Sequence, residues 1–139
     1  MTLLYLDTNI YLDYLEGRVE LFRPLGEFAF QIFKRTLSCE FTLILSSLLV
    51  EELSLHVSKE RIKEMLDDFH KRKKIIETAV KYEDKDTART IMRERHTPFQ
   101  DTLHMVVAKR MNASYFVTRN IKDFVELEDI IPIFLPENL

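Results

Sequence analysis

Residues 97–120 read TPFQDTLHMVVAKRMNASYFVTRN, a sharply bounded helix followed by a strand. Thr97 suits the N-cap of the helix, Pro98 suits its first position, and Gln100 suits the third position of a capping box. The apolar residues that follow predict that the helix runs to about Met111. The run SYFVT after it is typical of a buried strand. A helix that leads directly into a buried strand is typical of an α/β fold.

The same alternation extends outward along the whole chain. Strands are predicted at Leu3–Leu6, Phe41–Leu45, Lys74–Thr78, Ser114–Thr118 and Ile130–Phe134. Other helices are predicted at about Thr8–Leu15, Phe22–Leu37, Leu48–Leu55, Lys59–Phe69 and Asp84–Arg95, with Gly17 ending the first and Ser46 and Ser47 as caps of the third. Strands that alternate with helices predict an α/β protein with a mainly parallel sheet covered on both faces.

The composition is that of an ordinary soluble protein. The chain has 139 residues, 46% hydrophobic and 31% charged, so we expect a single domain over residues 1–139. A lone Cys39 cannot form an internal disulfide, which favours a reducing compartment. Apolar runs fall short of the roughly 18–20 residues of a membrane helix, and Asp7 interrupts the apolar N-terminus, which argues against a signal peptide. We therefore expect a cytoplasmic protein that has no membrane partner.

Basic residues are concentrated in the middle of the chain, although the net charge is −3. Residues 59–119 carry 15 of the 20 Lys and Arg but 10 of the 23 Asp and Glu. A basic segment between acidic flanks can steer a polyanion toward an acidic centre. An equally simple interpretation is that residues 59–74, which include the cluster KRKK at 71–74, are a solvated helix face.

Acidic side chains recur where strands end or helices begin. Asp7 follows LLYL, Glu52 lies in SSLLVEEL, Asp101 follows TPFQ, and Asn120 and Asp123 follow YFVTR. The carboxyl ends of parallel strands meet at one edge of a sheet, where α/β folds bind their ligands. Carboxylates gathered there repel one another unless a cation lies among them. The pattern predicts a hard-metal site, with phosphodiester chemistry as the first hypothesis.

Each acid also has an ordinary explanation at a helix end. Asp7 alone would cap the next helix, and Asn9 would either hold Asp7 or act as the cap itself. Glu51 or Glu52 would gain about 0.3–1 kcal/mol from the helix dipole. Capping does not explain, however, why all the acids are expected at the same sheet edge.

Two positions keep alternative interpretations. His104 lies one turn after Asp101 on the same helix face. We expect it to be an oriented structural partner or a substrate contact rather than a metal ligand. Asn120 would cap a last short helix that has Asp123 at its third position. Alternatively, one of these two residues completes the acidic site.

A resemblance to a known family rests on four segments, LYLDTNIYLDYL, SSLLVEEL, DTLHMVVAKRMNASYFVTRN and KDF. Together they resemble a PIN domain, in particular the VapC-type toxin ribonucleases of toxin–antitoxin systems. The resemblance covers almost the whole chain in the family's order. It implies a three-layer α/β/α sandwich with a mainly parallel central sheet, and cleavage of RNA phosphodiester bonds that depends on Mg²⁺ or Mn²⁺.

The resemblance assigns three acids directly. Asp7 matches the family's first acid, at the end of the first strand. Glu52 matches the second in preference to Glu51, because the family's acid directly precedes Leu. Asp101 matches the third.

The fourth acid stays open. The family's T-x-D/N pattern falls on Thr118 and Asn120, whereas Asp123 matches an acid that some members place just before Phe. Because Asn120 is neutral, a site of four carboxylates requires Asp123.

The implied mechanism gives each residue a role. We expect catalysis by Asp7, Glu52, Asp101 and Asp123, metal binding by Asp7, Asp101 and Glu52, support from Thr8, Asn9, Thr118, Asn120 and His104, and RNA contacts from Arg119, Lys71 and Arg72. Mg²⁺ retains several waters, so two or three carboxylates are enough to hold it. Glu52 would orient or deprotonate the attacking water.

The resemblance also implies partners. These are a small antitoxin protein that holds the enzyme inactive and a second copy of the chain in a homodimer. The main alternative is a catalytically silent PIN-like module that binds RNA or protein, which the neutral Asn120 favours. An aspartyl-phosphate enzyme would instead need a second acid two residues after Asp7, where the chain has Asn9.

Overall fold

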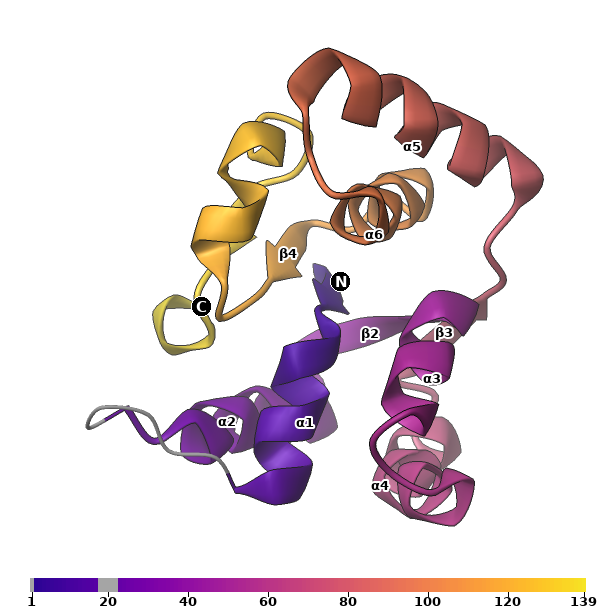
Figure 1. Cartoon of the computed structure of the whole chain (residues 1–139). Helices are drawn as coiled ribbons and strands as arrows, with labels where there is room; N and C mark the ends of the chain where they lie inside the picture. Colours follow the sequence, from indigo (N-terminus) through magenta and orange to yellow (C-terminus); the bar gives the residue numbers. More distant parts are fainter. Residues whose placement is uncertain (1, 18–22) are drawn as a thin grey trace.

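The computed structural model describes residues 2–17 and 23–139, and its centre is a parallel sheet of five strands (Figure 1). The strands are β1 (Thr2–Leu6), β2 (Phe41–Ser46), β3 (Ile75–Thr78), β4 (Tyr115–Val117) and β5 (Ile133–Phe134), in the spatial order β3-β2-β1-β4-β5. Leu4 of β1 pairs with Leu43 of β2 on one side and with Tyr115 of β4 on the other. The predicted α/β class is confirmed, and every strand pair is parallel.

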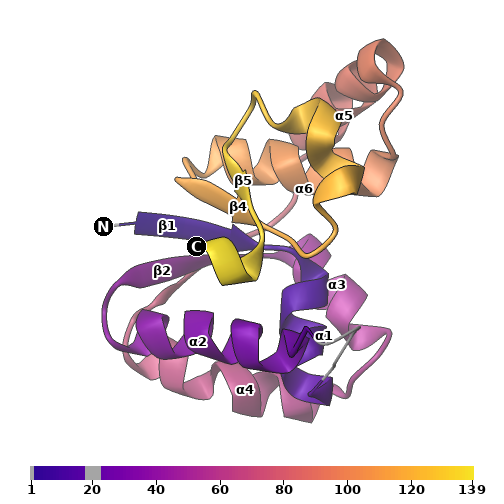
Figure 2. The same ribbon diagram turned by 90° about the vertical axis from the view of Figure 1, so that its left-hand side faces the viewer.

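Helices cover the sheet on both faces, which makes three layers (Figure 2). They are α1 (Thr8–Glu16), α2 (Leu25–Leu37), α3 (Ser47–Ser54), α4 (Lys59–Lys71), α5 (Tyr82–Arg95), α6 (Phe99–Arg110) and the 3₁₀ segments η1 (Ile121–Leu127) and η2 (Pro136–Asn138). The first four helices lie on one face, and α5, α6 and η1 lie on the other. Among the described residues, no helix has the length and hydrophobicity that crossing a membrane requires.

The order of the strands reverses at the centre of the sheet. From β1 the chain passes to β2 and then to β3 on one side, and it returns past β1 to β4 and β5 on the other. Right-handed crossovers in opposite directions place the connecting helices on opposite faces. The reversal point lies between β1 and β4, and open α/β sheets bind ligands there. Asp7 and Thr118 directly follow these two strands.

The central strands are apolar because helices cover both of their faces. Leu4, Tyr5 and Leu6 of β1 are fully buried, and so are all six residues of β2. Tyr5 stacks on Phe116 of β4, with 5.4 Å between the ring centroids. Burial of such side chains contributes about 1.5–3 kcal/mol each, so the sheet holds the strand ends in a defined register.

Two helix ends next to the sheet match the sequence prediction. Gly17 follows α1 with φ 58°, and its backbone N–H donates to Asp13 O and Tyr14 O. Ser46 caps α3 because its Oγ accepts a hydrogen bond from the Leu49 N–H at 3.2 Å. Ser47 does not share this role, because its Oγ accepts the Val80 N–H at 2.9 Å.

The start of α6 differs from the prediction. Its N-cap is Pro98, with ψ 141°, and the helix begins at Phe99, so the predicted capping box is wrong by one residue. Thr97 instead places its Oγ1 2.6 Å from Thr102 Oγ1 inside the protein. Asp101 still lies in the first turn, as expected. The predicted start of the second helix, Phe22, lies outside the described residues.

Candidate active site

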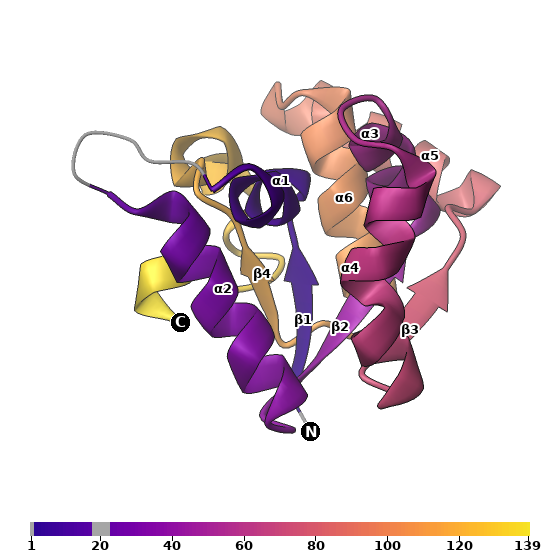
Figure 3. The same cartoon turned by 90° about the horizontal axis from the view of Figure 1, so that it is seen from below.

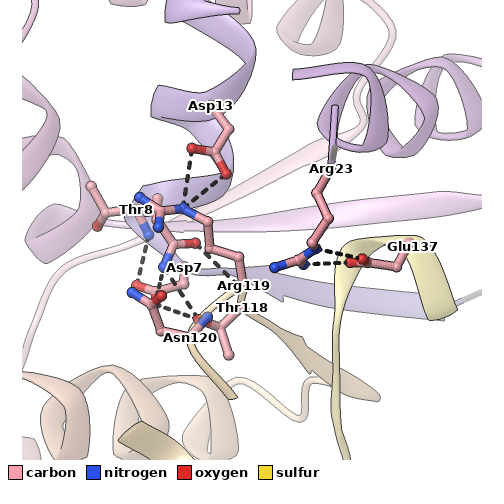
Figure 4. Close-up of polar contacts among 9 residues, drawn as sticks. Asp7, Thr8, Asp13, Arg23, Thr118, Arg119, Asn120 and Glu137 are labelled. Atoms are coloured by element: carbon pink, nitrogen blue, oxygen red, sulfur yellow. Dashed lines mark hydrogen bonds and ion pairs between the residues drawn. The ribbon is translucent and has the colours of Figure 1, made fainter. Parts of the chain in front are cut away.

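Asp7 is both the cap of α1 and the centre of a buried hydrogen-bond cluster (Figure 4). Its Oδ1 accepts the Thr8 N–H at 2.8 Å. Its Oδ2 accepts Asn9 Nδ2 at 3.1 Å and Thr118 Oγ1 at 2.9 Å. The capping explanation and the site explanation for Asp7 therefore hold together. Burial raises the pKa of this carboxyl, although bonds from Thr118 and Thr8 and the charge of His104 oppose the rise.

Glu52 reaches the same cluster from α3. Its Oε1 accepts hydrogen bonds from Thr8 Oγ1 at 2.5 Å and from His104 Nε2 at 2.9 Å. Burial alone would raise the pKa of Glu52, but the hydrogen bonds and the charge of His104 outweigh it and lower the pKa below its usual value. Glu51, its neighbour, is exposed and makes no side-chain hydrogen bond with a described residue. The structure thus separates the two glutamates as the sequence comparison did.

Asp101 faces the other acids from the first turn of α6. Its pKa is raised to about 6 by burial and by the negative charges of Asp7, Asp123 and Glu52, with His104 acting in the opposite direction. Asp7 follows β1, Glu52 lies in α3 and Asp123 lies in η1. Acids from four segments that are remote in sequence therefore influence one another through their charges. The negative charges of Asp7, Glu52 and Asp123 therefore act on Asp101, and the joint role of these acids as a site stays a prediction.

Asp123 adds negative charge near Asp101, and the choice between Asp123 and Asn120 as the fourth site residue stays a prediction. Asp123 raises the pKa of Asp101, whereas Asn120 is neutral. Asn120 lies at the N-cap position of η1, but its side chain makes no cap hydrogen bond there. Its backbone N–H donates to Thr118 Oγ1 at 3.1 Å, so Asn120 helps to orient the hydroxyl that holds Asp7.

The donor chemistry of this cluster fits a hard divalent cation. Carboxylate oxygens are the ligands that Mg²⁺ and Mn²⁺ prefer. The pKa of Asp101 is raised by burial and by repulsion from the other acids, and a cation relieves that repulsion. In the part of the chain that the structure describes, no group of three or more His, Cys, Asp or Glu side chains is placed to hold a metal ion. Mg²⁺ does not require a closed cage because it keeps several of its waters.

His104 is a buried partner of Glu52. Only 1% of its surface is exposed, which favours the structural interpretation over a substrate contact. Its Nε2 bonds Glu52, and its Nδ1 lies 2.6 Å from the hydroxyl of Tyr5. The sequence prediction missed Tyr5 and its contact with Ser46, whose Oγ lies 2.8 Å from the same hydroxyl. The available signal was a tyrosine hydroxyl inside the apolar strand LLYL.

The three basic residues expected to bind RNA lie in two different places. Arg119 follows β4 near Asp7, but its Nε pairs with the buried Asp13 at 3.0 Å and 3.2 Å (Figure 4). Its backbone N–H donates to Asn9 Oδ1 at 3.5 Å, so Arg119 anchors the loop after β4 to α1. The pair occupies Nε of Arg119, and the expected contact of this residue with RNA stays a prediction.

Lys71 and Arg72 lie at the opposite edge of the sheet from the acids. They end α4 and precede β3, whereas the acids follow the carboxyl ends of strands that run parallel to β3 (Figure 3). Lys71 pairs with Asp67 at 3.0 Å, and Arg72 Nη1 donates to Leu37 O at 3.4 Å. These two residues therefore lie apart from the acids, and their contact with RNA stays a prediction.

The fold and the acidic edge define the class: an α/β protein with a carboxylate site at the reversal point of a parallel sheet. The model of the PIN domain family matches residues 4–129, and the chain belongs to this family. No curated protein matches the chain at a significant level.

Solved structures share the whole fold at low sequence identity. VapBC2 from Rickettsia felis, bound to a DNA fragment of its promoter, matches with TM-score 0.67 and 20% identity over 96% of this chain and 98% of that one. A toxin–antitoxin complex from Klebsiella pneumoniae matches with TM-score 0.66 and 18% identity over 98% of each chain. FitAcB from Neisseria gonorrhoeae matches with TM-score 0.61 and 16% identity over 98% and 99%. At these identities the likeness establishes the fold.

Proposed function

We propose that this protein is a metal-dependent endoribonuclease that cleaves RNA phosphodiester bonds as the toxin of a toxin–antitoxin pair. The observation that carries the proposal is the raised pKa of Asp101, about 6, which results from burial and from the negative charges of Asp7, Asp123 and Glu52. Buried carboxylates that repel one another lower the stability of a protein, and they are found together where they hold a cation or perform acid–base chemistry. Membership of the PIN family supports the nuclease activity.

The residues divide the mechanism among them. Asp7, Asp101 and Glu52 would hold Mg²⁺ or Mn²⁺, and Asp123 would add negative charge beside them. The ion, when bound, would polarise a phosphoryl oxygen and lower the pKa of a water. Glu52 keeps an ionised carboxylate at neutral pH, which would accept a hydrogen bond from the attacking water and orient it.

The supporting side chains reduce the freedom of these acids. Thr118 and Asn9 hold Asp7, and Thr8 links the two acids because its N–H donates to Asp7 and its hydroxyl to Glu52. Catalytic groups must be held within about half an ångström of the productive geometry, and such bonds provide that. The Arg119–Asp13 pair would hold the loop that carries Thr118 and Asn120.

The proposal is tested by RNA cleavage with Mn²⁺ or Mg²⁺. Asp7→Asn and Asp101→Asn should each reduce kcat at least about 100-fold while circular dichroism shows an unchanged fold. Arg93→Gln, on the exposed face of α5, is a matched surface control that should cleave at the parent rate. Cleavage by both site variants at the parent rate would show that these acids do not perform the reaction.

A silent binding module is the competing function, and the neutral Asn120 is the observation in its favour. Thermal melting separates the two functions when Mn²⁺ is titrated without RNA. An active site should gain stability from Mn²⁺, by about 2.7 kcal/mol at a concentration 100 times the dissociation constant, and Asp7→Asn should abolish the gain. A module that has lost its metal site would melt at the same temperature throughout the titration.

The proposed partner is a small antitoxin, and the similar structures that contain toxin–antitoxin complexes support it. A basic side chain of that partner would find the acidic cluster complementary in charge. An apolar groove of about 260 Å³ between α1, α2 and α4, lined by Tyr14, Phe30, Phe33 and Phe69, offers it a second surface. Co-purification with a small protein that suppresses cleavage would test this partner, and sedimentation would test the proposed homodimer. A cytoplasmic location is part of the same proposal.

A further inference from the structure

Four polar side chains form a continuous buried chain behind the acidic cluster. Ser46 Oγ lies 2.8 Å from Tyr5 Oη, Tyr5 Oη lies 2.6 Å from His104 Nδ1, and His104 Nε2 lies 2.9 Å from Glu52 Oε1. Ser46 and Tyr5 are 0% exposed and His104 is 1% exposed. The residues come from β2, β1, α6 and α3, so tertiary packing alone brings them together.

The hydrogens along this chain are constrained at both ends. At one end the Leu49 N–H donates to Ser46 Oγ at 3.2 Å. At the other end an ionised Glu52 only accepts hydrogen bonds, so His104 must carry a hydrogen on Nε2. Tyr5 occupies Nδ1, and its ring packs edge-on against the imidazole with 5.6 Å between centroids and an angle of 67°. The orientation of the imidazole is therefore set by Tyr5.

A core strand has no need of this arrangement for its stability. A buried hydroxyl and a buried imidazole require partners, and an apolar replacement of the same shape is often neutral or stabilising. Phenylalanine at position 5 would keep the stacking on Phe116, whose ring lies within 9° of parallel to that of Tyr5. The polar chain ends on the carboxylate of Glu52, so its effect is expected on the orientation of that side chain.

We propose that Tyr5, with Ser46 behind it, is a positioning residue that acts through His104 to orient Glu52. Within the part of the chain that the structure describes, both side-chain hydrogen bonds of Glu52, from Thr8 and His104, are made by Oε1. This leaves Oε2 for the ion or the attacking water. The inference rests on the proposed nuclease function for its catalytic consequence, but the hydrogen-bond chain can be measured without it.

The chain contains its own control for a tyrosine substitution. Tyr11 in α1 is also 0% exposed, and its hydroxyl has no hydrogen-bond partner among residues 2–17 and 23–139. Tyr5→Phe and Tyr11→Phe thus each remove one buried hydroxyl from the core, and only the first breaks the chain to Glu52. Each keeps the aromatic ring, so each should fold, and thermal melting verifies that.

The kinetic experiment compares these two variants in RNA cleavage. Tyr5→Phe should lower kcat about tenfold and change KM for RNA by no more than about twofold. A tenfold loss is the lower end of the effect seen when a residue that orients a metal ligand is removed. Tyr11→Phe should leave both parameters unchanged. Ser46→Ala, one bond further from Glu52, should lower kcat less than Tyr5→Phe does. Equal kcat values for the two Phe variants would overturn the proposal.

An NMR experiment on the metal-free protein tests the chain independently of activity. With ¹⁵N-labelled histidine, His104 should show a slowly exchanging Nε2–H signal in the parent and in Tyr11→Phe. In Tyr5→Phe the signal should exchange rapidly and the Nδ1 shift should move. A signal that is unchanged in Tyr5→Phe would overturn the proposal, and so would a changed signal with full kcat, since the chain would then be structural only.

The two proposals fail in distinguishable ways. If the parent protein cleaves no RNA, the nuclease function fails. The NMR comparison then decides whether Tyr5 orients His104, because it requires neither metal nor substrate. If the parent is active and Asp7→Asn is inactive while Tyr5→Phe matches the parent, the nuclease function stands and the positioning role is wrong.

Discussion

Asp101 carries a folding cost that follows from its neighbours. Its pKa is about 6 in the folded protein, against 3.8 for an unperturbed carboxyl. Between these values the folded chain binds more protons than the unfolded chain, so its contribution to the free energy of unfolding falls as pH rises through the window. The penalty is complete above about pH 6. Stability is thus reduced at neutral pH so that a negative charge can be kept in the cluster.

The first prediction is that Asp101→Asn stabilises the metal-free protein at pH 7.5 by about 1 kcal/mol, a value reduced for solvent screening of a half-buried group. The gain should shrink to less than half of that at pH 4.5, where the parent carboxyl is protonated in the folded state. Urea unfolding at the two pH values measures the difference. A gain independent of pH would mean that the raised pKa of Asp101 is not its cause.

At the scale of elements, two glycines show how closely α1 and α2 approach. Gly17 ends α1 with φ 58°, and an added Cβ would meet no atom within 4 Å. Gly26, near the start of α2, is different, because its Cβ would lie 2.9 Å from Asp13 O and 2.9 Å from Gly17 Cα. The start of α2 therefore packs directly against the backbone at the end of α1.

We expect Gly17→Ala to cost about 1 kcal/mol, the penalty of a left-handed conformation, and to leave the site intact. Gly26→Ala should cost more, about 2–3 kcal/mol, because the contact is with backbone atoms that cannot rotate away. It should also disturb the Asp13–Arg119 pair and with it the loop after β4. Denaturant unfolding and RNA cleavage of both variants measure these effects. Equal losses of stability would contradict the close contact between the helices.

Local patterns predicted the elements well, because each is determined by its own residues. The alternation of strands and helices, the end of α1 at Gly17 and the position of Asp101 all follow from short-range chemistry. The Tyr5–His104 contact joins residues 99 positions apart, and no local pattern reports it. The predicted capping box failed because Pro98 has an extended ψ and takes the cap position itself.

At the scale of the whole molecule, the amino and carboxyl edges of the sheet lie further apart than the distance over which salt screens surface charges. The four residues of β3 span roughly 13 Å at 3.3 Å per residue, and Lys71 and Arg72 lie beyond its amino end. The Debye length at physiological ionic strength is about 8 Å. Charges at the amino edge are therefore largely screened from RNA bound at the carboxyl edge.

We accordingly predict that the double variant Lys71→Gln, Arg72→Gln changes KM for a short RNA by less than about twofold at physiological salt. A filter-binding or cleavage assay at two salt concentrations provides the measurement. At low salt, where the Debye length reaches about 30 Å, a larger effect is expected. A strong effect at physiological salt would place RNA on the amino edge as well.

The reversal of strand order also determines when the site comes into existence during translation. Asp7 and Glu52 leave the ribosome early, but Asp101, Thr118 and Asp123 belong to the last third of the chain. Synthesis at about 5–20 residues per second takes roughly 7–28 s for 139 residues. Because β1 lies next to β4, the nascent chain carries at most the first two of these acids until residue 101 has been made, and we infer that the site forms only after that point.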